Sequence, residues 1–271
     1  MKIFAIDLDE TLYNDYHEIG EENLRALNNA VNDNIKIVIA SGRTPCIIDN
    51  VLNKIGIDNK NNEYSIMANG SLVIANNGEI IDVHPIEFNI VKQLFDYAYD
   101  KDVCVQIFTD KHLYFYNCIE EEELEMIKLF PDGISLRNKK DGIDELKGEN
   151  IIKVMYEKRD FDYLKEISIG LKDICANQIE ISFSSNRYVE LNKIGINKGL
   201  GLLNLADALN IPYENTYAIG DNFNDIELIK LSGTGFAVNN ACDELKKVAD
   251  IILDENNNQN AVAAALKFIR R

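Results

Sequence analysis

Short apolar runs alternate with helix-period segments at both ends of this sequence, over residues 1–83 and again from residue 197 onward. The runs at 3–6 and 35–40 are rich in isoleucine, which favours strands. Between them, residues 20–33 place apolar side chains three or four positions apart, as on one face of a helix. This order of strand, helix and strand predicts βαβ units, whose strands form a parallel sheet.

The middle of the chain has a different pattern. Residues 104–117 read as two strands of a hairpin, and a second strand pair follows around residue 185, with helical segments between the two pairs. Paired strands around helices are typical of an α+β fold. We therefore expect an α/β protein with a Rossmann-like parallel-sheet core, formed by residues 1–83 and 188–271, and an inserted α+β cap domain at residues 84–187.

Local signals add two elements to the first part of the core. Thr44 and Pro45 have the residue types of an N-cap and a first helical residue, so a helix is expected from there to about Ile55. The pair Asn77-Gly78 separates two apolar runs and predicts a hairpin turn.

Composition excludes several kinds of partner. The formal net charge of −17 disfavours nucleic acid, whose binding depends on Lys and Arg that neutralise phosphates. The apolar run at 3–6 is too short for a signal peptide, and no stretch approaches the ~20 apolar residues of a membrane span. The five cysteines include no C-x-x-C pair and do not suggest a disulfide framework. We expect a cytoplasmic protein, monomeric by default, that binds neither nucleic acid nor membrane.

Acidic residues gather where the first apolar run ends, at Asp7, Asp9 and Glu10. Two carboxylates about 4 Å apart repel each other by roughly 4 kcal/mol at an effective dielectric constant near 20. A cation close to these residues would offset that repulsion.

Polar residues also follow other predicted strands, and the carboxyl ends of parallel strands meet at one edge of a sheet. Ser41 and Gly42 follow the second run, Asp221 follows the run TYAIG, and Lys198 begins a later helix. Each of these alone is more often a helix cap or a surface charge, but their joint occurrence at strand ends indicates a site. Asp7 and Asp221 could share Mg²⁺, which prefers oxygen ligands. Lys198, Ser41 and backbone N–H groups suit a phosphate group beside that metal.

The motifs DLDETL, ASGR, NKG and GDNFND together resemble the haloacid dehalogenase superfamily of phosphotransferases. The sequences MANGSL and AVNNA make the chain similar to the Cof-type sugar-phosphatase branch in particular. The resemblance implies a Rossmann-like core and Mg²⁺ as cofactor. The interval from Asp7 to Ser41 holds about one βαβ unit of ~30 residues, so the cap must lie in the second position, between Ser41 and Lys198.

The resemblance also implies roles for individual residues. Asp7 would be the nucleophile that forms an aspartyl-phosphate, and Asp9 would protonate the leaving group and then deprotonate water. The implied metal ligands are Asp7, the backbone carbonyl of Asp9, and Asp221, with Asn222 and Asp225 as further ligands or as residues beside them. The implied phosphate-binding residues are Leu8, Ser41, Gly42, Lys198 and Asn224. The expected reaction is magnesium-dependent hydrolysis of small phosphate monoesters, such as sugar phosphates.

Two departures from the family pattern and two alternative functions accompany this prediction. Glu10 stands where Cof-type relatives usually have Gly, and the loop NNQNAV has Ala261 at a usual Gly position.

A phosphomutase or other phosphotransferase could use the same core, because the motifs do not distinguish water from a sugar acceptor. A receiver-like signalling module is less favoured, since its third strand should end in an acid and here ends in Asn69-Gly70.

Overall fold

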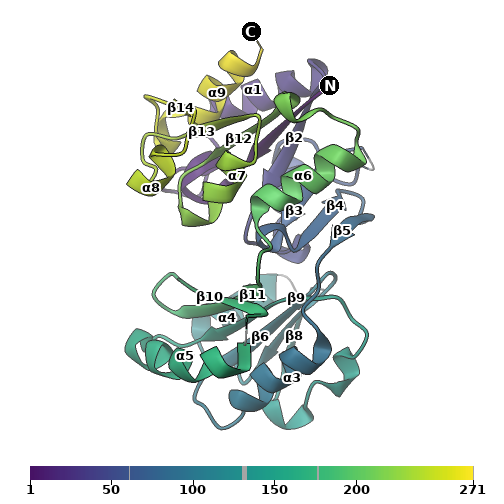
Figure 1. Ribbon diagram of the computed structural model, residues 1–271, viewed down its shortest axis with the longest axis vertical. Helices are drawn as coiled ribbons and strands as arrows, with labels where there is room; N and C mark the ends of the chain where they lie inside the picture. The colour runs from purple at the N-terminus through teal and green to yellow at the C-terminus, as the bar shows by residue number, and fades with distance from the viewer. Residues whose placement is uncertain (61, 130–132, 176, 271) are drawn as a thin grey trace. The chain divides into compact units, whose positions relative to one another are not determined.

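The computed structural model describes residues 1–60, 62–129, 133–175 and 177–270, and it divides into two compact units (Figure 1). The first unit contains Met1–Arg43, Ile48–Asp82 and Ile196–Arg271. The second contains Thr44–Ile47 and Val83–Gly195.

The first unit is built on an eight-stranded sheet in the order β14-β13-β12-β1-β2-β3-β4-β5. Its strands are β1 (Lys2–Ile6), β2 (Ile35–Ala40), β3 (Tyr64–Met67), β4 (Leu72–Ala75), β5 (Ile80–Val83), β12 (Thr216–Gly220), β13 (Thr234–Ala237) and β14 (Ile251–Ile252). The strands from β14 to β3 are parallel, and β4 pairs antiparallel with β3. Strand β1 lies between β12 and β2, where the strand order changes direction, and ligands bind at such a switch point in open α/β sheets.

Helices complete this unit. They are α1 (Glu21–Asn32), α2 (Asp49–Lys54), α6 (Lys198–Ala208), α7 (Ile226–Lys230), α8 (Asp243–Lys246) and α9 (Ala261–Ile269). Helix α1 packs against α9, and α6 packs against α7 (Figure 1). The core of β1, from Ile3 to Ile6, is completely buried, as expected for a central strand covered on both faces. The predicted α/β fold class is confirmed.

The expected helix from Thr44 to Ile55 is wrong in its first part. Pro45–Ile47 form a separate 3₁₀ turn, closed by the N–H of Ile47 on the Thr44 carbonyl at 3.2 Å. The α-helix starts only at Asp49, and Ile48 is its N-cap residue. The predicted hairpin at Asn77-Gly78 is present, with the N–H of Gly78 bonded to the Ala75 carbonyl at 2.8 Å.

The second unit has a six-stranded sheet in the order β10-β11-β9-β6-β7-β8. Its strands are β6 (Cys104–Thr109), β7 (Leu113–Tyr116), β8 (Ile134–Arg137), β9 (Ile151–Glu157), β10 (Ile179–Ser184) and β11 (Tyr188–Lys193). Its helices are α3 (Phe88–Tyr97), α4 (Glu121–Leu129) and α5 (Phe161–Cys175). Only β8 pairs in parallel, with β7, among the described ladders of this sheet, which is the expected α+β character.

The expected boundary near residue 188 is wrong by one strand. Residues 188–195 belong to the second unit, because β11 pairs antiparallel with both β10 and β9 in that unit's sheet. The sequence predicted the pairing of this strand with β10 but not its pairing with β9, which lies far away along the chain.

The two faces of the second sheet differ in polarity. Val105, Ile107 and their neighbours pack with α3 and α5 in an apolar core. Gln106 alternates with them and therefore lies on the opposite face, where its Nε2 donates to Oε2 of Glu123 from α4 at 3.1 Å. Arg187 donates to Oε1 of the same carboxylate at 2.6 Å.

This polar group also contains Tyr188, whose hydroxyl donates to Glu123, and the buried Glu157, which lies 3.6 Å from Arg187. Burial, with a further contribution from the Glu123 charge, raises the pKa of Glu157 to about 7 against the opposing effect of Arg187. We call Gln106, Glu123, Glu157, Arg187 and Tyr188 the glutamate cluster.

Two expectations from composition concern the whole chain. In the described part of the chain, no helix combines the length and the apolar content that crossing a membrane requires. The free cysteines are Cys104, Cys118, Cys175 and Cys242, and the side chain of Cys46 lies outside the described residues.

Candidate active site

Three aspartates of the first unit converge at the ends of β1 and β12. Asp7 directly follows β1, Asp221 directly follows β12, and Asp225 ends the short turn Phe223–Asp225. One carboxylate oxygen from each lies within 4.8 Å of the others, and all three side chains are buried. Parallel strands that end at the same edge bring these acids together, as the sequence predicted.

Lys198 supplies the positive charge inside this group. Its side chain is fully buried, and its Nζ atom donates to Oδ1 of Asp7 at 2.5 Å and to Oδ1 of Asp225 at 2.6 Å. Although burial opposes its charged form, the carboxylates of Asp225 and Asp7 raise the pKa of Lys198. The lysine is therefore a fixed cation. It begins helix α6, where the Asn197 side chain accepts the N–H of Leu200 at 2.9 Å.

One lysine does not balance three acids. Burial, followed by the charge of Asp225, raises the pKa of Asp7 well above its usual range, even though Lys198 opposes this shift. Burial and Asp225 also raise the pKa of Asp221, to about 6. With all four groups ionised, the cluster carries two uncompensated negative charges.

Neighbouring groups orient two of the acids. The hydroxyl of Thr11 donates to Oδ1 of Asp221 at 2.8 Å. Oδ2 of Asp225 accepts the N–H groups of Asp221 at 3.1 Å and Asn222 at 3.2 Å, while its Oδ1 accepts from Lys198. Both oxygens of Asp225 are thus engaged with protein donors, which suits a residue that holds the site in shape.

This donor set fits a magnesium ion. Mg²⁺ prefers oxygen ligands, tolerates few of them from protein and keeps several waters. Asp7 and Asp221 supply carboxylate oxygens, and a divalent cation would cancel the two excess negative charges of the cluster. Asn222 is exposed and its side chain caps the following turn by accepting the N–H of Phe223 at 2.9 Å.

Asp9 and Glu10 lie in the turn Leu8–Leu12 that follows Asp7, and neither has helical backbone angles, since Asp9 is extended with φ −75° and ψ 129°. Glu10 has φ 59° and ψ 9°, a left-handed conformation that glycine adopts more easily than other residues. This conformation explains why glycine would suit this position. Asn240 donates its Nδ2 to the Glu10 carbonyl at 2.8 Å and so supports the turn. The side chains of Asp9 and Glu10 are exposed, and that of Asp9 forms an ion pair with Arg43.

The loop after β2 carries Ser41 and Gly42. Ser41 is buried, and its Oγ accepts the N–H of Arg43 at 3.2 Å. A Cβ on Gly42 would lie 3.1 Å from Oδ1 of Asn69. The same oxygen accepts a hydrogen bond from Nδ2 of Asn224 at 3.4 Å. Asn69 therefore lies close to Gly42 and bonds to Asn224, two residues that are expected to bind phosphate.

Asn69 lies in a left-handed turn, Ala68–Gly70, at the end of β3. Gly70 has φ 94°, and a Cβ placed on it would come within 2.1 Å of the Asn197 carbonyl oxygen. The backbone of this turn thus packs directly against the residue that precedes Lys198.

Four residues contact the predicted site although the sequence assigned them no role: Thr11, Arg43, Asn69 and Asn240. They belong to the motifs DLDETL, ASGR, MANGSL and AVNNA. Their polar side chains within motifs were the available signal. The contacts themselves join segments distant in sequence, such as Asn240 with Glu10.

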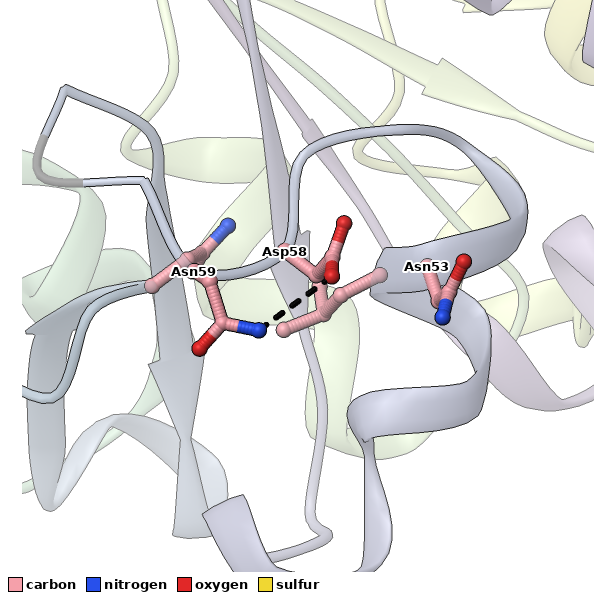
Figure 2. Close-up of a pocket in the computed structure, with 5 residues that line it drawn as sticks. Asn53, Asp58 and Asn59 are labelled. Carbon is pink, nitrogen blue, oxygen red and sulfur yellow. Dashed lines mark hydrogen bonds between the residues drawn. The ribbon is translucent and has the colours of Figure 1, made fainter.

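A separate pocket of the first unit is lined by Leu52, Asn53, Asp58, Asn59 and Asn76 (Figure 2). Within it, Asn59 donates to Asp58 at 3.3 Å (Figure 2). None of the described residues that line it is a lysine, arginine or histidine, and such a lining lacks the positive charge that would attract a phosphate group.

Comparisons with known proteins agree with this geometry. A family model described as haloacid dehalogenase-like hydrolase matches residues 4–266. Phosphatase YwpJ of Bacillus subtilis is 25% identical, over 99% of this chain and 100% of that protein. The 5-amino-6-(5-phospho-D-ribitylamino)uracil phosphatase YcsE of the same organism is 28% identical, over 98% and 95%. The crystal structure of a haloacid dehalogenase-like hydrolase from Bacteroides thetaiotaomicron has a TM-score of 0.86 and 26% identity, covering 99% of each chain.

Proposed function

This chain belongs to the haloacid dehalogenase-like hydrolases and is a phosphoric monoester hydrolase, and on that basis we propose that it hydrolyses small phosphate monoesters through an aspartyl-phosphate on Asp7, with Mg²⁺ as cofactor. The family predicted from the four motifs is confirmed, because the family model matches residues 4–266.

One observation carries the proposed mechanism. Asp7 is buried beside Lys198 and shares its surroundings with Asp221 and Asp225. A carboxylate at the end of a central strand, held by a fixed lysine and close to further acids, has the features of a nucleophile that works beside a metal ion. When bound, Mg²⁺ would be held by Asp7 and Asp221 and would stabilise negative charge on the transferring phosphoryl group.

In the first step, a carboxylate oxygen of Asp7 attacks the phosphorus atom, and the bond between phosphorus and the ester oxygen breaks. Asp9 gives its proton to the departing alcohol. Lys198 keeps the Asp7 carboxylate in place and offers a positive charge next to the incoming phosphate. The products of this step are a free alcohol and an aspartyl-phosphate.

In the second step, water attacks the phosphorus atom of the aspartyl-phosphate while Asp9 takes up one of the water protons. The bond between phosphorus and Asp7 breaks, which restores the carboxylate and releases inorganic phosphate. We assign phosphate binding to the backbone N–H groups of Leu8 and Gly42 and to the side chains of Ser41, Lys198 and Asn224.

The substrate class follows from what similar proteins act on. YcsE carries the name of a phosphatase of a phosphorylated ribitylamino compound, a small metabolite with a phosphate on a polyhydroxylated chain. We propose substrates of this general kind, including sugar phosphates. A monomeric enzyme remains our prediction.

A direct assay tests this proposal. The purified protein is incubated with a panel of phosphorylated metabolites and Mg²⁺, and the release of inorganic phosphate is measured. We expect release from at least one small monoester and its loss in EDTA. Phosphate release also separates a hydrolase from a phosphomutase, which would move the phosphate to another position of the sugar. Full activity in metal-free buffer would overturn the role of Mg²⁺.

A further inference from the structure

Arg43 contacts Asp9 directly, although the mechanism above gives Arg43 no part. Its Nε donates to Oδ2 of Asp9 at 3.2 Å, and its Nη2 donates to Oδ1 at 2.6 Å. Two parallel bonds from a planar guanidinium to both oxygens of a carboxylate give a strong and directional contact, which a lysine cannot reproduce.

The backbone of Arg43 is fixed on the loop that follows β2. Its N–H donates to Oγ of Ser41 at 3.2 Å, and its carbonyl accepts the N–H of Ala68 at 2.8 Å. The guanidinium lies over the ring of Tyr13, 5.7 Å from the centroid. Arg43 therefore joins the loop expected to bind phosphate to the side chain expected to transfer protons.

The contact leaves Asp9 able to react. Each carboxylate oxygen has two lone pairs, and the arginine fork uses one on each oxygen. The remaining lone pairs can hold the proton that Asp9 gives to the leaving ester oxygen or takes from the attacking water. Since Arg43 and Asp9 have side chains that are 33% and 48% exposed, their ion pair contributes little to folding, and the loss of Arg43 should affect function more than stability.

We propose that Arg43 is a positioning residue, which fixes the plane and direction of the Asp9 carboxylate so that a proton moves to the leaving oxygen and later from the attacking water. This inference rests on the proposed function, since it needs Asp9 as proton donor and acceptor. The competing role for Arg43 is direct binding of the substrate phosphate, and the experiment must separate the two.

A double-mutant cycle tests this role. Arg43→Met removes the guanidinium and keeps most of the side-chain stem, Asp9→Asn removes proton transfer, and the two changes are combined. With a sugar phosphate as substrate, Asp9→Asn should lower kcat by about 10²- to 10⁴-fold. Arg43→Met alone should lower kcat by about 10- to 100-fold, as the loss of an orienting partner does. The double variant should be no slower than Asp9→Asn, because Arg43 would have nothing left to position.

The leaving group gives a second readout. An activated aryl phosphate needs little protonation as it departs, so Arg43→Met should slow its hydrolysis much less than that of the sugar phosphate. Arg43→Lys keeps the charge without the fork, and its rate should fall between those of the wild type and Arg43→Met. If Arg43→Met does not fold, Arg43→Lys carries the same cycle.

Matched controls and contrary results complete the test. Arg25→Met removes an equal charge from the exposed face of α1 and should leave kcat unchanged. An increase in KM with kcat unchanged in Arg43→Met, or losses that multiply in the double variant, would assign Arg43 to phosphate binding and overturn the inference while the wild type remains an active phosphatase. A wild type inactive on every ester would instead overturn the proposed function and this inference with it.

Discussion

The two units of this protein each bury several acids around one cation, but they balance the charge in different ways. In the first unit, Lys198 faces three aspartates, and the pKa of Asp7 is raised well above its usual range. In the glutamate cluster of the second unit, Arg187 and two uncharged donors surround Glu123. The oxygens of Glu123 are therefore satisfied by protein alone.

This difference in charge balance distinguishes a metal-binding site from a cluster of buried acids with a structural role. The aspartates leave negative charge that protein groups do not neutralise, which is the condition for holding a divalent ion. The glutamate cluster has a smaller deficit, which is concentrated on Glu157. Its Oε1 atom has no hydrogen-bond partner among the described residues, and burial raises its pKa to about 7. Protonation can remove that deficit without any metal.

The largest expected effect comes from exchanging one acid in each cluster. Asp7→Asn should reduce turnover of phosphate monoesters by about 10⁴-fold or more, since it removes the nucleophile. Glu123→Gln, which alters a buried acid of the second unit, should retain kcat within a few-fold. Steady-state kinetics with a sugar phosphate measures both. Comparable losses in the two variants would contradict the assignment of the chemistry to the aspartates.

Magnesium should stabilise the folded protein only by binding to the aspartates of the first unit. At a concentration 100 times its Kd, Mg²⁺ should raise the free energy of unfolding by about 2.7 kcal/mol, since it binds the folded state. Differential scanning calorimetry in Mg²⁺ and in EDTA should show this difference in the wild type and in Glu123→Gln. It should be absent in Asp221→Asn. A magnesium response that persists without Asp221 would place the ion elsewhere.

The glutamate cluster should respond to pH instead. Because the folded-state pKa of Glu157 is raised from 4.5 to about 7, the folded protein binds more protons than the unfolded chain between these values. This group therefore contributes a loss of stability as pH rises through that window. Glu157→Gln removes the loss and should be more stable than the wild type at pH 8 by an amount of the order of 1 kcal/mol.

Urea unfolding at pH 5 and pH 8 measures the effect of Glu157→Gln. The gain should shrink toward pH 5, where Glu157 is already protonated in the folded state. Glu166→Gln, a change at an exposed residue of α5, serves as the control and should show no such pH dependence. A Glu157→Gln variant that is less stable than the wild type at pH 8 would mean that the ionised carboxylate stabilises the cluster.

The smallest expected effect concerns backbone conformation. Glu10 in the first unit and Ser185 in the second both have positive φ, 59° and 51°. Glycine at either position relieves strain but loosens the unfolded chain, so each change should alter the free energy of unfolding by at most about 1 kcal/mol. Glu10→Gly should also change kcat/KM, because Glu10 follows Asp9, whereas Ser185→Gly should not. If both variants have the kcat/KM of the wild type, the backbone conformation of Glu10 does not influence the site.

The sequence predicted those features that depend on local pattern. The hairpin expected within residues 104–117 forms β6 and β7, and the ends of β1 and β12 bring Asp7 and Asp221 together because parallel strands share an edge. The hydrophobic pattern did not predict β8, because its four residues are too few to show a clear period. It predicted the strand pair around residue 185, but it did not reveal that the second strand, β11, also pairs with distant β9 and so belongs to the second unit.

Side-chain contacts within the site were beyond prediction for a related reason. The pairing of Arg43 with Asp9 depends on the direction that the turn Leu8–Leu12 gives to Asp9, and that turn combines an extended Asp9 with a left-handed Glu10. Such a conformation is rare for a glutamate and has no local sequence signal. The hydrogen bond from Thr11 to Asp221 depends on the same turn.

A substitution at Gly70 could disable the site even though Gly70 is neither one of its acids nor its serine or lysine. Any larger residue there would collide with the Asn197 carbonyl, and Asn197 caps the helix that begins with the catalytic-site lysine, Lys198. Relief of that collision would shift the start of α6 and withdraw the ammonium group from Asp7. An allele with alanine at position 70 would keep every acid, the serine and the lysine, yet encode a defective enzyme. A survey of related genomes that scores only those motif residues would count such an allele as functional.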